Sequence, residues 1–392
     1  MRKKVVLVDA RKARDFGIGT YVRGLLGGLA GLDRFALQAL VLPGDEALLP
    51  AGVTATACAA AHYSFGELLA VRRAISAAKP DLFHALHYVV PLFPPPATVV
   101  TIHDLMHLTR PEHAAPAKRA YARWMIGRAL RLSARVIAVS EATKKEILAF
   151  GPEQGGKVEV IPNGVEERFF LESEEGNAAR DAATRSPAAT RSPSSPFKES
   201  SPYLLFLGND KPHKNLDGLL RAWPRVHAAH PTLSLVLAGV KPERTLPVGA
   251  KAVGWVPDED VPALVALAEA LVLPSFAEGF GLPVLEAQAA GTPVACSDLP
   301  ALRETAGEAA VFFDPADVGS ILAGLEEILK DEELRKGLRK MGRERAAQFT
   351  WARVAERTAG IYESVLYPFK EKISSPEPRH DPTREGAKDL SS

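Results

Sequence analysis

Short runs of apolar and β-branched residues recur along this chain, and segments with helical spacing separate most of them. Because these runs are apolar on both faces, they are typical of strands in a parallel sheet that helices cover on both sides. The runs form two series, which predict an α/β fold with two doubly wound parallel sheets. The predicted strands are 5–9, 36–42, 82–86, 98–104, 136–140 and 158–162, then 203–208, 233–239, 271–274, 293–297 and 311–314. The predicted helices include 21–29, 65–78, 117–132, 216–229 and 262–268.

Length and a break in composition divide the chain into two parts. Its 392 residues exceed what one hydrophobic core normally supports. Between the two series of strands lies a segment without apolar periodicity, in which Thr-Arg-Ser-Pro occurs twice. Such a segment buries too little surface to offset the entropy lost on ordering it. We therefore expect a first domain at 1–171, a flexible linker or insertion at 172–201, a second domain at 202–350, a last helix at 351–368 and a disordered tail at 369–392.

Charge and cysteine content exclude several classes of protein. The 48 lysines and arginines balance 47 aspartates and glutamates, and a net charge of +1 gives no support to nucleic-acid binding. Cys58 and Cys296 are too few for a disulfide framework and lack the spacing of metal ligands. The first apolar run stops at Asp9, too early for a signal peptide, and no run of about 18 apolar residues could span a bilayer. We expect a cytoplasmic protein.

The segment 275–294, SFAEGFGLPVLEAQAAGTPV, carries the strongest functional signal. A strand ends just before it, Pro283 stands where a helix should begin, and Gly291 stands where that helix should end. The helix N-terminus then faces the carboxyl edge of the sheet with free N–H groups, which can bind phosphate. Gly279 and Gly281 lack a Cβ and would let a ligand approach the backbone closely. The alternative is an ordinary turn between a strand and a helix.

Glu278 and Glu286 have seven residues between them, and the pattern resembles the E-x7-E signature of retaining GT-B glycosyltransferases. More closely, the chain resembles family 4, a group that includes many bacterial mannosyltransferases. The similarity extends over about residues 3–366. It also rests on the motifs Gly17-Ile-Gly-Thr-Tyr, Thr101-Ile-His-Asp-Leu, Val139-Ser-Glu-Ala-Thr-Lys, Ile161-Pro-Asn-Gly-Val, Lys214-Asn-Leu and Gly291-Thr-Pro-Val.

The resemblance implies a fold and a set of residue roles. In the GT-B fold two Rossmann-like domains face each other across a cleft. Here the first domain would bind the acceptor, the second would bind the nucleotide sugar, and the last helix would return to the first. Glu286 would accept hydrogen bonds from the ribose and Glu278 from the transferred sugar, because an ionised carboxylate accepts paired hydroxyls well. The backbone from Phe280 to Leu282 would hold sugar and phosphate, and His103 would lie near the reacting centre.

The reaction that the resemblance implies needs positive charge at the diphosphate. Breaking the bond between a sugar and a diphosphate builds negative charge on the leaving group, which preorganised hydrogen-bond donors and cations must stabilise. Lys214, after the strand at 203–208, is the leading cation; the alternative is a solvated lysine near a helix start. Family members commonly pair this lysine with an arginine. Here Asn209 and His213 stand at the matching positions, and Lys211 is the candidate substitute.

Gly17 and Gly19 precede a predicted helix that starts near Tyr21, so their loop is a second place that favours an anion. The loop does not fit the fingerprint of a dinucleotide-binding turn, because Val22 stands where a third glycine or alanine belongs. In the family this loop faces the diphosphate across the cleft. The alternative is a plain loop.

We expect a metal-independent protein. Asp258 and Asp260 match the D-x-D metal motif of another glycosyltransferase fold, but they precede a helix near Val261, so helix capping and the attraction of their charges to the helix dipole explain them better. His103 and His107 are four residues apart without the glutamate of a zinc-protease helix. The alternative for His103 is a buried histidine that is bonded to the backbone.

Residues 110–135 hold seven arginines or lysines against one glutamate. On the predicted helix Tyr121, Met125, Ala129 and Leu132 form one apolar stripe. The usual meaning of this pattern is a solvated helix face. The alternative is peripheral contact with anionic lipid on the inner face of a membrane, which would suit a lipid-linked acceptor.

We predict an enzyme that transfers a hexose, with mannose favoured, from a nucleotide-diphosphate sugar to a glycan or a lipid-linked acceptor. We expect retention of configuration and no cofactor. GDP-mannose is favoured on the resemblance alone, and polysaccharide biosynthesis is the expected setting. Two alternatives remain: a GT-B phosphorylase or nucleotide-sugar hydrolase, and a non-catalytic protein that binds a nucleotide sugar.

Overall fold

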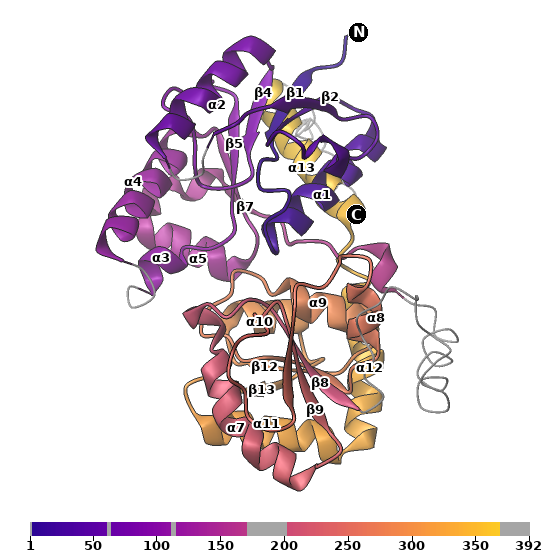
Figure 1. The fold of residues 1–392 in the computed structure, drawn as a ribbon. Helices are drawn as coiled ribbons and strands as arrows, with labels where there is room; N and C mark the ends of the chain where they lie inside the picture. The colour runs from indigo at the N-terminus through magenta and orange to yellow at the C-terminus, as the bar shows by residue number, and fades with distance from the viewer. Residues whose placement is uncertain (1, 61–63, 111–114, 171–201, 369–392) are drawn as a thin grey trace, which may run out of the picture.

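Two parallel sheets form the framework of the molecule, as the alternation of strands and helices predicts (Figure 1). The structure, a computed structural model, describes residues 2–60, 64–110, 115–170 and 202–368. The first sheet has seven strands in the order β3-β2-β1-β4-β5-β6-β7. They are β1 (Val5–Asp9), β2 (Ala36–Val41), β3 (Thr54–Ala57), β4 (Leu82–Ala85), β5 (Thr98–Ile102), β6 (Arg135–Ala138) and β7 (Val158–Val160).

The second sheet has six strands in the order β10-β9-β8-β11-β12-β13. They are β8 (Tyr203–Leu207), β9 (Ser234–Ala238), β10 (Ala250–Gly254), β11 (Ala270–Leu273), β12 (Val294–Ser297) and β13 (Val311–Phe313). Every strand pair in both sheets is parallel. The two sheets belong to two domains that face each other, which is the expected GT-B arrangement (Figure 1).

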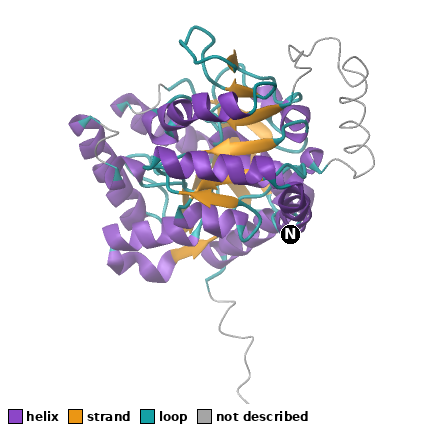
Figure 2. Cartoon of the chain, turned by 90° about the horizontal axis from the view of Figure 1, so that it is seen from below, coloured by secondary structure: helices purple, strands orange, loops and turns teal. Residues whose placement is uncertain are grey.

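Helices enclose the strands of each domain (Figure 2). The helices of the first domain are α1 (Ile18–Leu32), α2 (Phe65–Ala78), α3 (Met106–Thr109), α4 (Pro116–Leu132) and α5 (Glu141–Phe150). Those that follow are α7 (Leu216–Ala229), α8 (Val261–Ala266), α9 (Leu282–Ala289), α10 (Pro300–Ala306), α11 (Val318–Lys330), α12 (Glu332–Ala346) and α13 (Trp351–Leu366). Short 3₁₀ helices lie at Glu46–Leu48, Pro152–Lys157, Glu167–Phe169 and Pro212–Lys214.

The strands are apolar on both faces because each face packs under its own helices. In β1, Val6 and Val8 belong to one core cluster, whereas Leu7 between them belongs to another. In β8, Leu204 and Phe206 belong to one core cluster, whereas the residues beside them in the strand belong to another. Successive side chains of a strand point to opposite faces, so a continuous apolar run serves both layers at once.

Each sheet reverses its strand order at one point, between β1 and β4 in the first and between β8 and β11 in the second. The loops that leave the two strands at such a point diverge and open a crevice at the carboxyl edge, where ligands of open α/β sheets bind. The loops concerned are 10–17 and 86–97 in the first domain, and 208–215 and 274–281 in the second. Function is therefore expected along these four loops.

The last helix, α13, packs against α1 of the first domain (Figure 1). Their backbones approach so closely that a Cβ on Gly28 would lie 2.7 Å from the Cβ of Ala355. The two segments that connect the domains also meet, because the N–H of Val165 donates to the carbonyl of Phe349 at 2.9 Å. The chain thus crosses between domains twice at one place.

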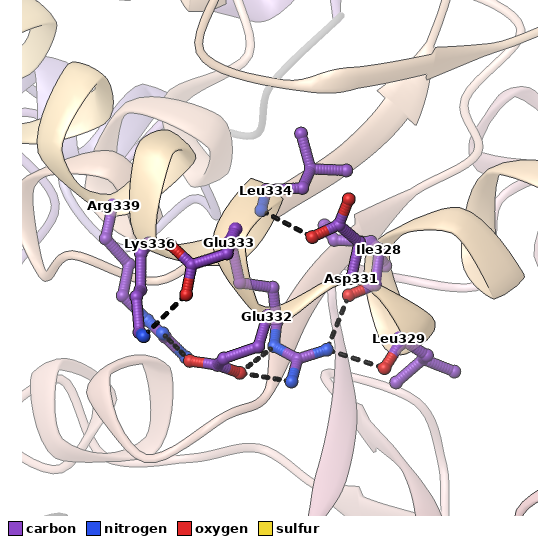
Figure 3. A network of polar contacts seen from close by, with 9 residues as sticks. Ile328, Leu329, Asp331, Glu332, Glu333, Leu334, Lys336 and Arg339 are labelled. Carbon is purple, nitrogen blue, oxygen red and sulfur yellow. Dashed lines mark hydrogen bonds and ion pairs between the residues drawn. The ribbon is translucent and has the colours of Figure 1, made fainter.

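A sharp corner joins α11 to α12 (Figure 3). Asp331 accepts a hydrogen bond from the N–H of Leu334 at 2.8 Å and so caps α12. Arg335 donates to the carbonyls of Ile328 and Leu329, which lie at the end of α11. These bonds satisfy polar groups at both helix ends, and α12 then packs on α9, which borders the candidate site.

Some features differ from the sequence-based expectation, and others fall outside the described residues. The edge strands β3 and β10 were not predicted, and α1 begins at Ile18 rather than near Tyr21. The expected linker at 172–201 and the expected tail at 369–392 lie outside the described residues. The boundaries 1–171 and 202–350 remain predictions.

Candidate active site

Lys214 and Glu278 meet at the crevice of the second domain. Lys214 follows β8 and Glu278 follows β11, the two strands at which the sheet order reverses. The Nζ of Lys214 lies 2.7 Å from Oε1 of Glu278, and the same oxygen accepts a hydrogen bond of 2.6 Å from Ser275. Lys214 is almost fully buried, so its charge acts in a region of low dielectric. The structure therefore brings together two of the residues that the sequence selected.

The N-terminus of α9 lies a few residues after Glu278 and has no capping side chain. Gly281 occupies the cap position with a left-handed backbone (φ 98°), and no side chain caps the helix. Among the described residues, the backbone N–H groups of Phe280, Gly281 and Leu282 make no hydrogen bond to other backbone groups. Pro283 is the second helical residue and has no N–H to satisfy. The predicted anion-facing turn is present, with its three N–H groups unused.

Glu286, one turn into α9, is buried within a cavity between the domains. Burial raises the pKa of Glu286 from 4.5 to about 7, and the negative charge of Glu166 adds to the rise. In the described part of the chain no group donates a hydrogen bond to this carboxyl. Glu286 is thus an acceptor that the protein itself leaves unsatisfied.

The first domain contributes its Gly17 loop to the same cavity. Gly17 has a left-handed backbone (φ 77°), and a Cβ added there would meet nothing within 4 Å. Gly19 is different, because a Cβ there would lie 2.4 Å from the carbonyl oxygen of Ala13. The lack of a side chain at Gly19 thus serves the packing of the loop itself. Trp255, which the sequence analysis did not select, lines the cavity and is 63% exposed.

An ion pair closes this cavity across the domains. The guanidinium of Arg23 lies 2.7 Å from Asp258, and Arg168 donates to the carbonyl of Asp258 at 2.6 Å. The helix expected near Val261 is present as α8, with Asp260 at its cap position, but the expected capping is wrong because the Asp260 side chain accepts no capping hydrogen bond. Asp258 instead forms an ion pair with Arg23 of the first domain.

The domains touch at Gly279. A Cβ on Gly279 would lie 1.8 Å from the carbonyl oxygen of His103, so only glycine allows this approach. The hydroxyl of Ser140 donates to the carbonyl of Gly279 at 2.7 Å, and Thr143 donates to it at 3.2 Å. A Cβ on Gly281 would in turn lie 2.4 Å from Leu302. The space at both glycines is filled by protein, not left open for a ligand as the sequence suggested.

His103 also lies at this contact between the domains: its carbonyl faces Gly279, and its ring packs within the first domain. Its Nε2 lies 3.0 Å from the carbonyl oxygen of Leu86, so Nε2 carries the proton and Nδ1 is an acceptor. The ring packs edge-on to Tyr21 at 4.8 Å between centroids. Burial lowers the pKa of His103, so the ring is neutral near pH 7. The buried, backbone-bonded state that we weighed as the alternative is what the structure contains, at the position where the resemblance expects a site residue.

Asn209 and Lys211 form the turn after β8. The side chain of Asn209 accepts a hydrogen bond of 3.2 Å from the N–H of Lys211, and the Lys211 side chain is exposed. Burial, aided by the charge of Lys214, lowers the pKa of His213 to about 4. His213 is therefore uncharged near neutral pH and is not a second cation. A role for Lys211 at the diphosphate remains a prediction.

Where the structure describes side chains, no three His, Cys, Asp or Glu groups converge to hold a metal ion.

The basic helix α4 differs from its predicted stripe, since Met125 and Ala129 are buried while Leu132 is 42% exposed. Trp124 is 40% exposed, and the guanidinium of Arg128 lies 5.2 Å from its ring centre. In the described ranges no helix has the length and hydropathy needed to cross a bilayer.

Family models match both domains. The model for "Glycosyltransferase Family 4" matches residues 17–169, and that for "Glycosyl transferases group 1" matches residues 189–345. O-antigen chain mannosyltransferase B of Escherichia coli is 30% identical over 68% of this chain and 70% of its own length. MMP alpha-(1->4)-mannosyltransferase of Mycolicibacterium hassiacum is also 30% identical, over 68% of this chain and 65% of its own length.

Solved structures share the fold. Sucrose-phosphate synthase from Thermosynechococcus elongatus is 21% identical with a TM-score of 0.74, covering 93% of this chain and 99% of that one. WaaG, a glycosyltransferase involved in lipopolysaccharide biosynthesis, is 15% identical with a TM-score of 0.72, covering 91% and 99%. Anabaena HepE, solved with UDP and glucose, is 18% identical with a TM-score of 0.69, covering 93% and 100%. The chain belongs to the group 1, family 4 glycosyltransferases and is a glycosyltransferase of the GT-B fold.

Proposed function

We propose that this glycosyltransferase moves mannose from a nucleotide-diphosphate mannose to a glycan or lipid-linked acceptor, with retention of configuration and without a metal ion. The observation that carries the proposal is the convergence of Lys214, Glu278 and the unused N–H groups at the start of α9. Gly279, next to Glu278, contacts the carbonyl oxygen of His103 in the first domain. Mannose is favoured because the two relatives named above are mannosyltransferases.

The diphosphate binds between Lys214 and the N-terminus of α9. Lys214 supplies one buried positive charge, and the N–H groups of Phe280 to Leu282 add hydrogen bonds and the positive end of the helix dipole. Preorganised groups of this kind stabilise the charge that grows on a leaving phosphate. Lys211 is proposed as the second cation, since its flexible side chain is exposed beside the crevice. In this proposal these groups, in place of a divalent ion, stabilise the negative charge of the leaving diphosphate.

The nucleoside binds in the cavity beside Glu286. Glu286 accepts hydrogen bonds from the two ribose hydroxyls, which would satisfy a carboxyl that has no partner in the protein. Trp255 offers an exposed ring for the base to stack upon. Guanine is favoured by the family resemblance, so the proposed nucleotide sugar is GDP-mannose.

Transfer proceeds on one face of the sugar. The bond between C1 of mannose and the diphosphate oxygen breaks, and its electron pair stays with the diphosphate. The acceptor hydroxyl oxygen bonds to C1 from the same face, and its proton passes to the leaving phosphate oxygen. Glu278 is already held by Lys214 and Ser275, which suits it to bind sugar hydroxyls rather than to attack C1.

A second proposal concerns location. The exposed Trp124 and Leu132 on the basic helix α4 favour contact with the anionic inner face of a membrane. Arg110 is set apart from this surface, because it donates to the carbonyl of Phe276 in the second domain. Sedimentation of the protein with vesicles of phosphatidylglycerol, but not with vesicles of phosphatidylcholine, is the expected result; equal binding to both contradicts it.

The function is tested by thermal shift and calorimetry with UDP-, GDP- and ADP-sugars in the presence of EDTA. We expect GDP-mannose to bind most tightly, and Glu286→Ala to weaken binding while the exposed control Glu259→Ala does not. Binding of none of these compounds, or unchanged affinity in Glu286→Ala, contradicts the proposal. Release of free mannose without an acceptor would indicate a hydrolase, and binding without turnover over a broad acceptor set would indicate a non-catalytic protein.

A further inference from the structure

A row of hydrogen-bonded side chains crosses the interior of the first domain and ends beside His103. The hydroxyl oxygen of Tyr362, on α13, lies 2.6 Å from Nδ1 of His84, on β4. Nε2 of His84 lies 2.9 Å from Oγ1 of Thr101, and that oxygen lies 3.1 Å from the hydroxyl of Tyr21, on α1. We call these four residues the buried chain. The proposed function gives none of them a role.

The polar groups of the buried chain are matched to one another within the core. The exposed fraction of each of the four residues is 0%. Burial, aided by the nearby ring of His103, lowers the pKa of His84 to about 3, so the imidazole of His84 is neutral. A neutral imidazole has one donor nitrogen and one acceptor nitrogen, and each of them meets a hydroxyl here.

Stability alone does not explain why four polar side chains occupy this part of the core. A hydrogen bond in a protein interior replaces one that the unfolded chain makes with water, so its net gain is small, and apolar side chains of the same shape can do as well. What a fully satisfied polar network adds is a defined orientation of its side chains. The buried chain therefore fixes the position of the Tyr21 ring, whose hydroxyl is its last member.

The ring of Tyr21 is in contact with the ring of His103. The two rings meet edge to face, with 4.8 Å between their centroids and 85° between their planes. Thr101, which holds the hydroxyl of Tyr21, precedes His103 by two positions at the end of β5. Alternate residues of a strand point to the same side, so Thr101 and His103 both present their side chains to Tyr21. Trp351, at the start of α13, packs on the Tyr21 ring as well, at 5.8 Å between centroids.

This contact with Tyr21 matters because His103 is otherwise held at one point. In the described ranges the His103 side chain makes one hydrogen bond, from Nε2 to the carbonyl of Leu86 at 3.0 Å. One bond does not define the plane of a ring whose χ2 torsion has broad energy minima, so packing on Tyr21 has to define it. His103 itself is half-buried and lies at the contact between the domains.

We propose that Tyr21 is a positioning residue for the transfer reaction: the buried chain anchors Tyr21, and Tyr21 holds the imidazole of His103 in the orientation that the reaction uses. The inference rests on the proposed function, in which Glu278 binds the sugar and its neighbour Gly279 touches the carbonyl of His103. Because Glu286 and α9 of the second domain bind the nucleotide, a change at Tyr21 lowers the rate of transfer and leaves the affinity for nucleotide sugar unchanged.

The first test removes one hydroxyl group. Tyr21→Phe keeps the ring but releases it from Thr101, and we expect kcat to fall about three- to tenfold, as for one lost hydrogen bond, with the Kd of GDP-mannose unchanged. The matched control is Tyr203→Phe, which removes a buried hydroxyl that donates to the carbonyl of Leu264 at 2.7 Å in the second domain. Both variants lose a buried hydrogen bond, but the control should keep the wild-type kcat. A wild-type kcat in folded Tyr21→Phe overturns the inference.

A double-mutant cycle decides whether Tyr21 acts through His103. Tyr21→Phe is expected to change kcat by less than about twofold in His103→Ala, because the group that Tyr21 positions is then absent. The same fall in both backgrounds would mean that Tyr21 acts on another group, and would overturn the inference. Tyr362→Phe breaks the far end of the buried chain and leaves Tyr21 intact, so it serves if Tyr21→Phe does not fold. It should also lower kcat, and a wild-type kcat in this variant contradicts the anchoring role.

Nitrogen NMR of the imidazole reports the state of His103 without any turnover. In protein labelled with ¹⁵N at its 10 histidines, the His103 signals are those that disappear in His103→Ala. We expect one tautomer, with the proton on Nε2, in the wild type and in Tyr203→Phe. Tyr21→Leu removes the supporting ring and should give a mixture of both tautomers. A single unchanged tautomer in folded Tyr21→Leu overturns the inference.

The outcomes separate this inference from the proposed function. If the wild-type protein neither binds GDP-mannose nor transfers mannose, the proposed function fails. If the wild type transfers mannose but Tyr21→Phe and Tyr362→Phe both keep its kcat, the buried chain is structural and only the inference fails.

Discussion

Glu286 carries a carboxyl group in a place where ionisation is unfavourable. It is buried and has no hydrogen-bond donor among the described residues, and burial raises its pKa from 4.5 to about 7. The free protein therefore tolerates a destabilising group, which ribose hydroxyls would stabilise on binding. An unsatisfied buried carboxyl favours the proposed binding role over a structural one, since a structural carboxylate is normally satisfied within the protein.

Glu286→Gln is expected to stabilise the free protein above pH 7 and to weaken nucleotide binding. Because the folded pKa lies above the unfolded value, the folded state binds the extra proton, and wild-type stability falls as the pH rises from about 4.5 to about 7. A shift of this size corresponds to about 3 kcal/mol. The gain in free energy of unfolding should be near that value at pH 8 and small at pH 5, as measured by denaturant unfolding. A gain that does not depend on pH would contradict the assignment.

Residues that pair over long sequence distances could not be found from the sequence. Lys214 and Glu278 were selected because motifs around them resemble a family, and the structure places them 2.7 Å apart. Arg23 and Asp258 are separated by 235 positions, and nothing in their local sequence indicates the contact. The same holds for Arg11 and Glu67, 56 positions apart. Ion pairs of this kind depend on which strands become neighbours.

At the scale of elements, strands were predictable where they are buried on both faces. The missed strands β3 and β10 lie at the edges of their sheets, with sequences TATA and AKAVG that are mostly not buried. Edge strands need no continuous apolar run, so their pattern is weak. The helix α9 was predictable because Pro283 and Gly291 mark its ends independently of burial.

The contact between α1 and α13 is expected to depend on one glycine and not on its neighbour. A Cβ on Gly28 would lie 2.7 Å from Ala355 and from the carbonyl oxygen of Trp351, whereas a Cβ on Gly27 would meet nothing within 4 Å. Gly28→Ala should therefore destabilise by about 1–3 kcal/mol through overpacking. Gly27→Ala should stabilise by up to about 1 kcal/mol, because alanine favours a helix interior.

Thermal and urea unfolding of the two variants provide the check. If the last helix did not pack on the first domain, both alanines would stabilise α1 alike. Equal stabilisation would therefore contradict the described position of α13.

At the scale of the molecule, the Glu304 carboxylate of the second domain forms hydrogen bonds to the first domain. At the start of α5, both carboxylate oxygens of Glu304 accept the single backbone N–H of Glu141, at 2.8 and 2.9 Å, and one of them also accepts that of Ala142 at 3.3 Å. Ser140, the cap of that helix, donates to Gly279 of the second domain. The motif at Val139 that carries part of the family resemblance thus lies at a contact between domains. The positive end of the α5 dipole adds to the attraction.

Glu304→Gln is expected to favour separation of the domains. It removes the charge from two hydrogen bonds at a helix N-terminus, a loss of about 1–2 kcal/mol. The apparent affinity for nucleotide sugar should fall about five- to thirtyfold if binding requires the closed state. Small-angle scattering should show a larger radius of gyration, while the exposed control Glu308→Gln changes neither quantity. A wild-type radius and affinity in Glu304→Gln would contradict this role.

The stereochemistry of transfer without metal tests the central claim most directly. GDP-α-mannose and a mannoside acceptor are incubated with the enzyme and EDTA, and the anomeric proton and carbon signals of the product are followed by NMR. We expect an α-linked product to form at a rate that EDTA does not change. A β-linked product, or transfer that stops with EDTA and resumes with manganese, would contradict a retaining enzyme that relies on Lys214 and the N-terminus of α9.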